Sequence, residues 1–446
     1  MPRSPRLYRI RRVTVDTVAV YGRWVLVLLV VTTPLIANAE PLGFDDSVRE
    51  AAANNADLRT ARANLAAAGY NVSAAYAGYF PQASAGLSYS HSTGSAVTTT
   101  GTSAGSVIVT GTSDTYSASV SVNQNLFAGF QDSARIDQGD ANRVAAEASY
   151  AVTRASVSQA LKVAFANLKY AQDSVALADS IVHRLEENVR LVGLRFDSGG
   201  ENKGSLLLTQ ASLAQARLGR LQAGQAVTTA QASLAQALGR SDAHGIEIRG
   251  EVPTRLPELA PDFGALTRQA PQYQLAVATE RAAAAGITLA RSAYYPSLNL
   301  TGSVGRVGSD WFPEDSHRAV GVNVSVPIFS GGRDYYAVRS AAASFDAAGA
   351  DKESVERQTR VALEQAYSGY VQAVEGVKVA QAFVDAAQTR AEIARAQYNN
   401  GLLTFNDWKL IEDDLTQRQT NYLLSQRDRV SAEAAWEQAQ GKGVMP

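Results

Sequence analysis

Ser103 is the residue whose surroundings come nearest to a pattern for nucleophilic chemistry. The run from Gly101 to Gly105 reads Gly-Thr-Ser-Ala-Gly and matches the nucleophile elbow of serine hydrolases. That elbow needs a strand before the serine and a helix after it, because the sharp turn between them exposes the hydroxyl. Here a tract rich in Ser, Thr and Gly surrounds Ser103 instead. We therefore expect no enzyme; an ester assay on Ser103→Ala would test the alternative of a hydrolase.

Metal and nucleic-acid chemistry find no support in the residue pattern, and we expect no cofactor. The chain has no cysteine, and its histidines lack any ligand spacing such as His-x-x-x-His. The first 39 residues hold six of the 41 basic and one of the 42 acidic residues, which leaves 35 basic against 41 acidic in the rest. This negative balance, with no basic patch, argues against nucleic-acid binding. The histidines are His91, His183, His244 and His317.

Glu201 and Asp407 are acidic residues whose placement could matter for transport. Each follows a glycine, Gly199 or Gly401, that comes directly after a long periodic apolar pattern. Glycine readily adopts the left-handed conformation that ends a helix, so we expect a helix turn at each position. Carboxylates repeated around a pore would favour cations. Alternatively, each carboxylate only stabilises the positive end of the following helix. The acidic run 412–414 indicates a charged outer face.

These turns belong to a unit that occurs twice, at an offset of 202 residues. The run Leu-Phe-Ala-Gly at 126–129 returns as Ile-Phe-Ser-Gly at 328–331, and Phe-Asp-Ser-Gly at 196–199 returns as Tyr-Asn-Asn-Gly at 398–401. Between these landmarks the apolar residues step by four and three, as in heptads. The sequence therefore predicts two copies of one unit, each with a long helix.

Each copy is expected to contain a helix, a β-hairpin, a long helix and a returning helix, in that order. The first repeat, 40–250, would hold a helix near Phe44 to Ala77, a hairpin at about 80–127, a long helix at about 133–196 and a helix at about 205–238. The second repeat, 251–446, would hold a helix near Phe263 to Ala293, a hairpin at about 296–329, a long helix at about 333–398 and a helix at about 405–440.

Apolar and polar residues alternate along the expected strands. Val320, Val322 and Val324, for example, alternate with Gly321 and Asn323. A period of two places the two kinds on opposite faces, and runs of about ten residues suit a tilted membrane-spanning strand. Four strands leave open edges, whose unpaired backbone groups are costly in hydrocarbon. Several chains should therefore close one barrel; two would reach about eight strands and three about twelve.

The first 39 residues predict a secretory signal peptide. Six arginines precede an apolar run from Trp24 to Ile36, and small residues of the A-x-A kind follow at Ala37–Ala39. About 13 apolar residues fall short of the roughly 20 that span a bilayer as a helix. We therefore expect an exported protein whose membrane attachment comes from the folded body.

Together with the duplicated unit, the run Pro-Ile-Phe-Ser-Gly-Gly-Arg at 327–333 makes residues 40–446 resemble the TolC family of outer-membrane efflux proteins. The resemblance implies a mainly α fold with a transmembrane β part. It implies a homotrimer with a 12-stranded β-barrel in outer-membrane lipid and a long α-helical barrel across the periplasm. It further implies a passive exit duct of a tripartite efflux pump or type I secretion system. The implied partners are a periplasmic adaptor (membrane fusion) protein and an inner-membrane pump of RND, ABC or MFS type.

The resemblance also implies a gate at the periplasmic helix turns, closed by acidic and tyrosine side chains. Tyr398 and Asp407 match that pattern, and Glu201 lies in the corresponding turn of the first repeat. Leu403 and Leu410 replace a basic and an acidic residue of the family's pattern, so a charged latch would be incomplete. The sequence names neither the cargo nor the class of pump. An alternative function is a secreted or surface coiled-coil stalk, an adhesin without a pore.

Overall fold

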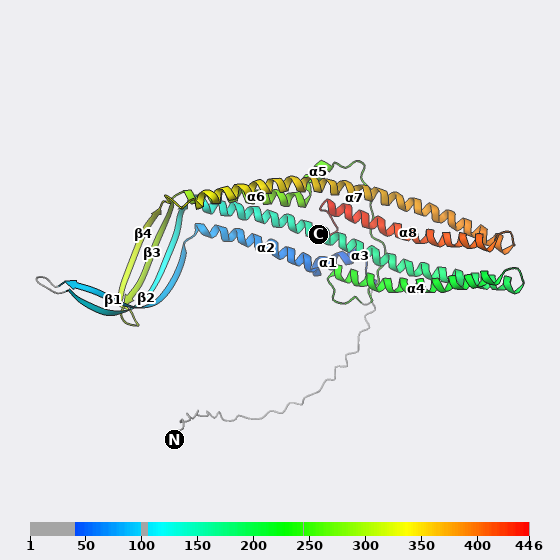
Figure 1. Ribbon diagram of the computed structural model, residues 1–446, viewed down its shortest axis with the longest axis horizontal. Coiled ribbons are helices and arrows are strands. Elements are labelled where there is room, and N and C mark those ends of the chain that lie inside the picture. The colour runs from blue at the N-terminus through cyan, green and yellow to red at the C-terminus, as the bar shows by residue number, and fades with distance from the viewer. Residues whose placement is uncertain (1–40, 100–105, 244, 446) are drawn as a thin grey trace, which may run out of the picture. The chain divides into compact units, whose positions relative to one another are not determined.

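The computed structural model describes residues 41–99, 106–243 and 245–445, and residues 40–446 form one compact unit. The segment 1–39, predicted as a signal peptide, Ser103 and His244 lie outside the described residues. The helices (Figure 1) are α1 (Phe44–Asn54), α2 (Ala56–Tyr76), α3 (Gln131–Asp197), α4 (Lys203–Leu238), α5 (Phe263–Gln269), α6 (Pro271–Arg291), α7 (Arg333–Asn399) and α8 (Phe405–Ala439). The strands are β1 (Gln82–Thr99), β2 (Ser106–Ala128), β3 (Ser297–Gly308) and β4 (Asp315–Ser325), and short 3-10 helices η1 (Ala77–Tyr79) and η2 (Ser292–Tyr294) precede β1 and β3.

Two long helices, α3 and α7, run along the whole helical part (Figure 1). Each has 67 residues, which corresponds to about 100 Å at 1.5 Å per residue. Helices α2 and α6 lie along the halves of α3 and α7 near the strands, and α4 and α8 lie along the halves away from them (Figure 1). Helix α3 also packs against α6 and α8, so the two repeats share one body. Within the described residues, every helix is too short or too polar to cross a membrane.

The first moderate helix of each repeat is two helices rather than one, so that prediction was wrong. Asn55 is extended between α1 and α2, and its side-chain oxygen accepts hydrogen bonds from the backbone of Asp57 (3.0 Å) and Leu58 (3.2 Å). This is an N-cap, which starts a new helix. In the second repeat, Ala270 is extended before Pro271, the first residue of α6. Proline lacks the backbone donor that a continuous helix would need there.

The strands form one antiparallel sheet in the order β1-β2-β3-β4. Its register confirms the alternation: one face is apolar and the opposite face polar. Serines pair across the polar face, Ser84 with Ser121 at 2.9 Å and Ser88 with Ser117 at 2.7 Å. The outer sides of β1 and β4, the two edges of the sheet, have no strand partner among the described residues. The apolar face carries Leu87, Val120, Val122, Leu300, Val304, Val320, Val322 and Val324.

Each strand of the first hairpin is longer than the roughly ten residues that the sequence predicted for a strand. Strands β1 and β2 have 18 and 23 residues, whereas β3 and β4 have 12 and 11. The pairing of β2 with β3 ends at Tyr116, but β1 and β2 stay paired as far as Thr99 and Ser106. A two-stranded ribbon therefore continues beyond the four-stranded sheet.

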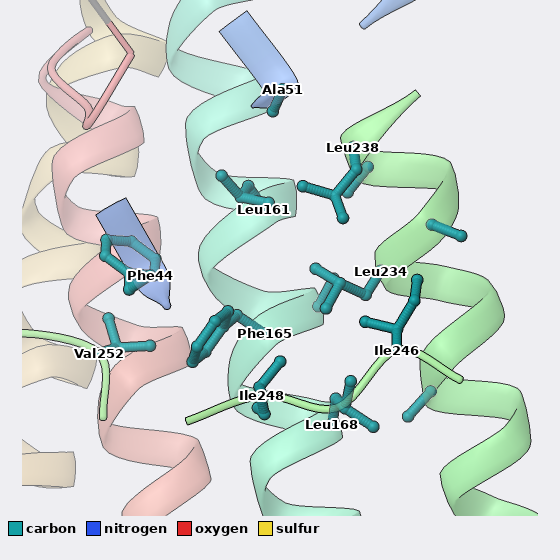
Figure 2. Packing of buried hydrophobic residues seen from close by; sticks show 14 of the residues in the cluster. Phe44, Ala51, Leu161, Phe165, Leu168, Leu234, Leu238, Ile246, Ile248 and Val252 are labelled. Carbon is teal, nitrogen blue, oxygen red and sulfur yellow. The ribbon is translucent and has the colours of Figure 1, made fainter. Parts of the chain in front are cut away.

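The largest apolar core lies where α1 and the linker, the segment 239–261 between α4 and α5, meet α3 and α4 (Figure 2). Phe44 of α1 packs edge-on against Phe165 of α3, with ring centres 5.4 Å apart. Ile248 of the linker forms a parallel bridge with Leu42. Figure 2 shows side chains of the linker reaching this core, which joins the linker to the first repeat. They are Ile246, Ile248 and Val252.

Candidate gate at the helix turns

Gly199 and Gly401 end the two long helices in the same way. Their φ angles are 75° and 72°, in the left-handed region. The amides of Gly199 and Gly200 donate to the carbonyls of Phe196 (3.0 Å) and Arg195 (2.7 Å), and those of Gly401 and Leu402 donate to the carbonyls of Tyr398 (3.0 Å) and Gln397 (2.9 Å). This pattern is the Schellman motif, which satisfies carbonyls at a helix end. Both predicted turn glycines therefore occupy helix C-termini.

Tyr398 is the centre of contacts between the two turns. It is 1% exposed, and its ring stacks on Trp408 of α8 with centres 4.3 Å apart. The guanidinium of Arg195 lies 4.5 Å from the ring centre, and the same group donates to the Tyr398 carbonyl. The Tyr398 hydroxyl donates to Glu201 Oε2 at 3.0 Å. These bonds join the α7–α8 turn to the α3–α4 turn.

The electrostatic setting keeps the Tyr398 hydroxyl a donor. Burial raises the pKa of Tyr398 well above its usual value, and the hydrogen bond to Glu201 and the charge of Glu201 raise this pKa further. Arg195 acts in the opposite direction. The raised pKa keeps the phenolic proton on Tyr398 to a higher pH than on an exposed tyrosine, so the hydroxyl remains a donor to Glu201.

Glu201 uses both carboxylate oxygens. While Oε2 accepts from Tyr398, Oε1 accepts from the backbone amide of Asn202 at 3.1 Å. Asn202, in turn, caps α4 by accepting from the Ser205 amide at 3.0 Å. The helix-capping role therefore belongs to Asn202, and Glu201 is free to hold Tyr398.

Asp407 lies in the first turn of α8 and is exposed. Thr404 caps this helix: its hydroxyl accepts from the Asp407 amide at 3.2 Å and donates to the Asp407 carboxylate at 2.7 Å. The structure thus brings Tyr398 and Glu201 together, whereas Asp407 bonds to Thr404. In a single chain Asp407 performs the helix-start role, and a ring of Asp407 side chains stays a prediction.

A second set of contacts lies deeper between the helices. Glu412 is 6% exposed, and it forms ion pairs with Arg184 of α3 (3.3 Å) and Arg395 of α7 (3.7 Å). Burial lowers the pKa of Arg184, and the charge of Glu412 partly offsets this. The prediction that 412–414 is an outer face was wrong for Glu412, because α8 turns this side chain toward α3 and α7. Asp413 and Asp414 pair along α8 with Lys409 and Arg418.

Sequence patterns gave no site role to three residues of this region: Arg195, Trp408 and Glu412. Each differs in kind from the residue 202 positions away in the other repeat: Gln397, Leu206 and Gln210. These differences are no distinguishing signal, because most neighbouring positions, such as Arg190 and Glu392, also differ between the repeats. Only the packing of the helices brings the three residues into the site. Among the described residues, no group of three His, Cys, Asp or Glu could hold a metal ion.

Comparison with known proteins identifies the class of protein that this fold and these turns define. The family model described as outer membrane efflux protein matches residues 47–240 and 265–442. The chain belongs to this family, and the resemblance to TolC-type channels is confirmed. Members are channel proteins rather than enzymes. The protein accordingly resides in the outer membrane and extends into the periplasm.

Individual relatives agree with this family. The outer membrane efflux protein BepC of Brucella suis is 24% identical over 408 residues, which cover 87% of this chain and 83% of BepC. The nickel-cobalt-cadmium resistance protein NccC of Alcaligenes xylosoxydans is 27% identical over 214 residues, about half (48%) of either chain. The crystal structure of the outer membrane protein VceC from Vibrio cholerae superposes with a TM-score of 0.76 at 20% identity, covering 90% of this chain and 96% of VceC.

Proposed function

We propose that three copies of this chain form a passive exit duct for efflux. The four-stranded sheet carries this proposal, because it has one apolar face, one polar face and two unpaired edges. Such a sheet satisfies its backbone in lipid only when copies close into a barrel. Three copies give about twelve strands, with the polar face around an aqueous lumen and the apolar face toward lipid.

The turns at the far ends of α3 and α7 form the gate of this duct. Tyr398 belongs to the second repeat, while Glu201 and Arg195 belong to the first. Their bonds hold the α7–α8 pair against the α3–α4 pair. Opening requires these helix pairs to separate, which breaks the Tyr398–Glu201 bond. The charged latch of the family's pattern is replaced here by one tyrosine, one carboxylate and one arginine.

The partners follow from this arrangement. A periplasmic adaptor packs against the helix turns and separates the pairs, and an inner-membrane pump of the RND, ABC or MFS type supplies cargo. Efflux is supported by the relatives; type I secretion is the second use of the same duct. The name of NccC concerns nickel, cobalt and cadmium, but selection among metals, drugs and polypeptides would fall to the pump.

Conductance of the purified full chain in planar bilayers tests the duct. We expect discrete channels of low open probability, carried by a heat-sensitive trimer from the outer-membrane fraction. A water-soluble monomer without conductance would contradict the proposal and favour the stalk.

Asp407 provides a separate test of the lumen. If three Asp407 carboxylates surround the mouth, they attract divalent cations. Asp407→Ala should then weaken block by divalent cations severalfold, measured as single-channel current. Thr404→Val, which removes the hydroxyl that caps α8 but keeps the carboxylate, is the matched control. Unchanged block in Asp407→Ala would leave Asp407 with its helix-start role alone.

A further inference from the structure

Two arginines interrupt the apolar face of the sheet. Arg306 of β3 lies opposite Ala118 of β2, and Arg318 of β4 lies opposite Val304 of β3. Both are exposed, and neither has an ion-pair partner among the described residues. A guanidinium that faces lipid without a counter-charge is unfavourable, and its presence points to a specific partner.

The two arginines lie toward the outer end of the sheet, away from the helices. The row next to Arg306 holds Tyr116, whose ring contacts Tyr89 (4.8 Å between centres) and Trp311 (5.6 Å). The rings of Tyr89 and Trp311 are exposed and that of Tyr116 is partly buried between them. Aromatic residues clustered on the lipid side mark the level of the membrane interface. A long arginine side chain one or two rows below that level reaches the headgroups by extending along the sheet.

The acidic residues nearby do not neutralise these arginines. Asp114 lies beyond Tyr116 on the same face, and it accepts hydrogen bonds from the Tyr89 hydroxyl at 2.9 Å and the His91 ring at 2.7 Å. Asp315 pairs with Val307 in the register and therefore lies on the polar face. Asp310 and Glu314, in the loop between β3 and β4, form no ion pair with either arginine, so the outer part of the apolar face carries two unpaired positive charges among the described residues.

Arg306 and Arg318 are also placed to act together. Arg306 pairs with Ser316, two residues from Arg318, so the two are diagonal neighbours, about 7–8 Å apart in an antiparallel sheet. Two guanidinium groups at this spacing can bind one phosphate, since each presents a planar pair of donors. We propose that Arg306 and Arg318 bind a phosphate group of an outer-leaflet lipid on the outside of the barrel.

This site rests on the proposed trimeric barrel and adds a role within it. Strand β4 is an edge of the sheet, so Arg318 lies beside the seam with the next copy. A lipid whose phosphate is held there contacts both chains at the seam. Bound lipid therefore stabilises the trimer, and it does so without entering the lumen.

The experiment measures thermal dissociation of the purified full-length trimer in uncharged detergent micelles. One sample receives a bisphosphorylated glycolipid of the outer leaflet, one the same lipid with its phosphates removed, and one inorganic phosphate. We expect only the phosphorylated lipid to raise the dissociation temperature, by several degrees. The variant R306Q/R318Q should lose most of this rise, and R306K/R318K should retain part of it.

Arg281→Gln is the matched control, because Arg281 is an exposed arginine on α6, away from the strands. It should respond to lipid as the native protein does. An equal rise with the dephosphorylated lipid or with inorganic phosphate would overturn the proposal, as would a full rise in R306Q/R318Q. If that variant fails to assemble, an absent lipid response in the native trimer decides against the site. Conductance of the same preparations separates failure of the lipid site from failure of the duct.

Discussion

At the scale of single residues, the gate depends on a bond between the two repeats. Tyr398 is buried against Trp408, whereas the corresponding residue of the first repeat, Phe196, is about one-third exposed (36%) and has no hydroxyl. Only the second repeat therefore has a phenolic hydroxyl at this position that can donate to a carboxylate of the other turn. The two repeats of the chain differ at the turns where they meet. Because Phe196 has no hydroxyl, the hydroxyl–carboxylate bond between the turns forms only from Tyr398 to Glu201.

Tyr398→Phe should favour the open mouth. The variant keeps the ring on Trp408 but removes the donor to Glu201. A hydrogen bond to a charged group contributes about 1.5 kcal/mol, which corresponds to roughly a tenfold rise in the open-to-closed ratio. Single-channel open probability measures it. Tyr150→Phe, which removes a hydroxyl bonded to Arg62 far from the turns, should leave the gate unchanged. Equal open probability in Tyr398→Phe and the native channel would argue against the gate.

Glu412→Gln should destabilise the helix pairs. It leaves Arg184, which is largely buried, without its carboxylate, and removing one partner of a buried pair costs about 3 kcal/mol. Thermal denaturation, followed by circular dichroism, should show a lower midpoint temperature than that of the native protein. The neighbouring Asp413→Asn removes an exposed pair with Lys409 and should change stability by less than about 0.5 kcal/mol. A similar loss of stability in Glu412→Gln and Asp413→Asn would contradict the burial of Glu412.

At the scale of elements, the ends of the helices differ in how closely they are packed. Gly199 has φ 75° and open space around it, whereas at Gly239, the end of α4, an added Cβ would lie 2.6 Å from the Asn54 carbonyl oxygen. The turn at Gly199 thus depends on backbone conformation alone. The turn at Gly239 also depends on a close approach to the junction between α1 and α2.

Gly199→Ala and Gly239→Ala separate these two demands. Left-handed backbone costs a residue with a Cβ about 1–2 kcal/mol, and this should be the whole loss for Gly199→Ala. Gly239→Ala should lose clearly more, since Asn54 must also move. Denaturation midpoints of the two variants in one detergent provide the comparison. An equal loss of stability in the two variants would mean that Asn54, at the junction between α1 and α2, can move at no energetic cost.

At the scale of the whole molecule, the sheet edges determine how copies assemble. Strands β1 and β4 are the two edges of a four-stranded antiparallel sheet, so they run in opposite directions. Strand β4 of one copy can therefore pair with β1 of the next copy as a further antiparallel pair. Ring closure removes every edge, which an isolated chain cannot do. The membrane part is thus specified by the chain but completed only in the oligomer.

Cysteine pairs can detect this closure cleanly, because the chain has no cysteine of its own. Ser84→Cys on β1 is combined in turn with Ala319→Cys, Gly321→Cys or Asn323→Cys on β4, all on the polar face. We expect one pair to yield disulfide-linked dimers and trimers on non-reducing gels. A pair at Ser121 and Ser303, which are neighbours within one sheet, should cross-link only internally. Absence of intermolecular products from every β1–β4 pair would contradict the barrel.

Much of the fold could be predicted because its signals are periodic and local. Heptad stepping indicated long helices at about 133–196 and 333–398, and the structure has them at Gln131–Asp197 and Arg333–Asn399. The break at Asn55 was missed. Its N-cap is local, but the side-chain amide that forms the cap is also held by a hydrogen bond that it donates at 3.1 Å to the carbonyl of Ala237, which is 182 residues away. No local pattern reports such a contact.

The amino-acid sequence by itself determined the repeat, the helix-ending glycines and the two faces of the strands, because each depends on residues adjacent in the chain. It also named Tyr398, Glu201 and Asp407 as candidates. Only the tertiary structure decided that Tyr398 and Glu201 meet while Asp407 stays with Thr404. It likewise decided that Glu412 is buried. The physical reason is that contacts between distant segments depend on which helix faces pack together, and residue spacing along one helix does not specify its neighbour.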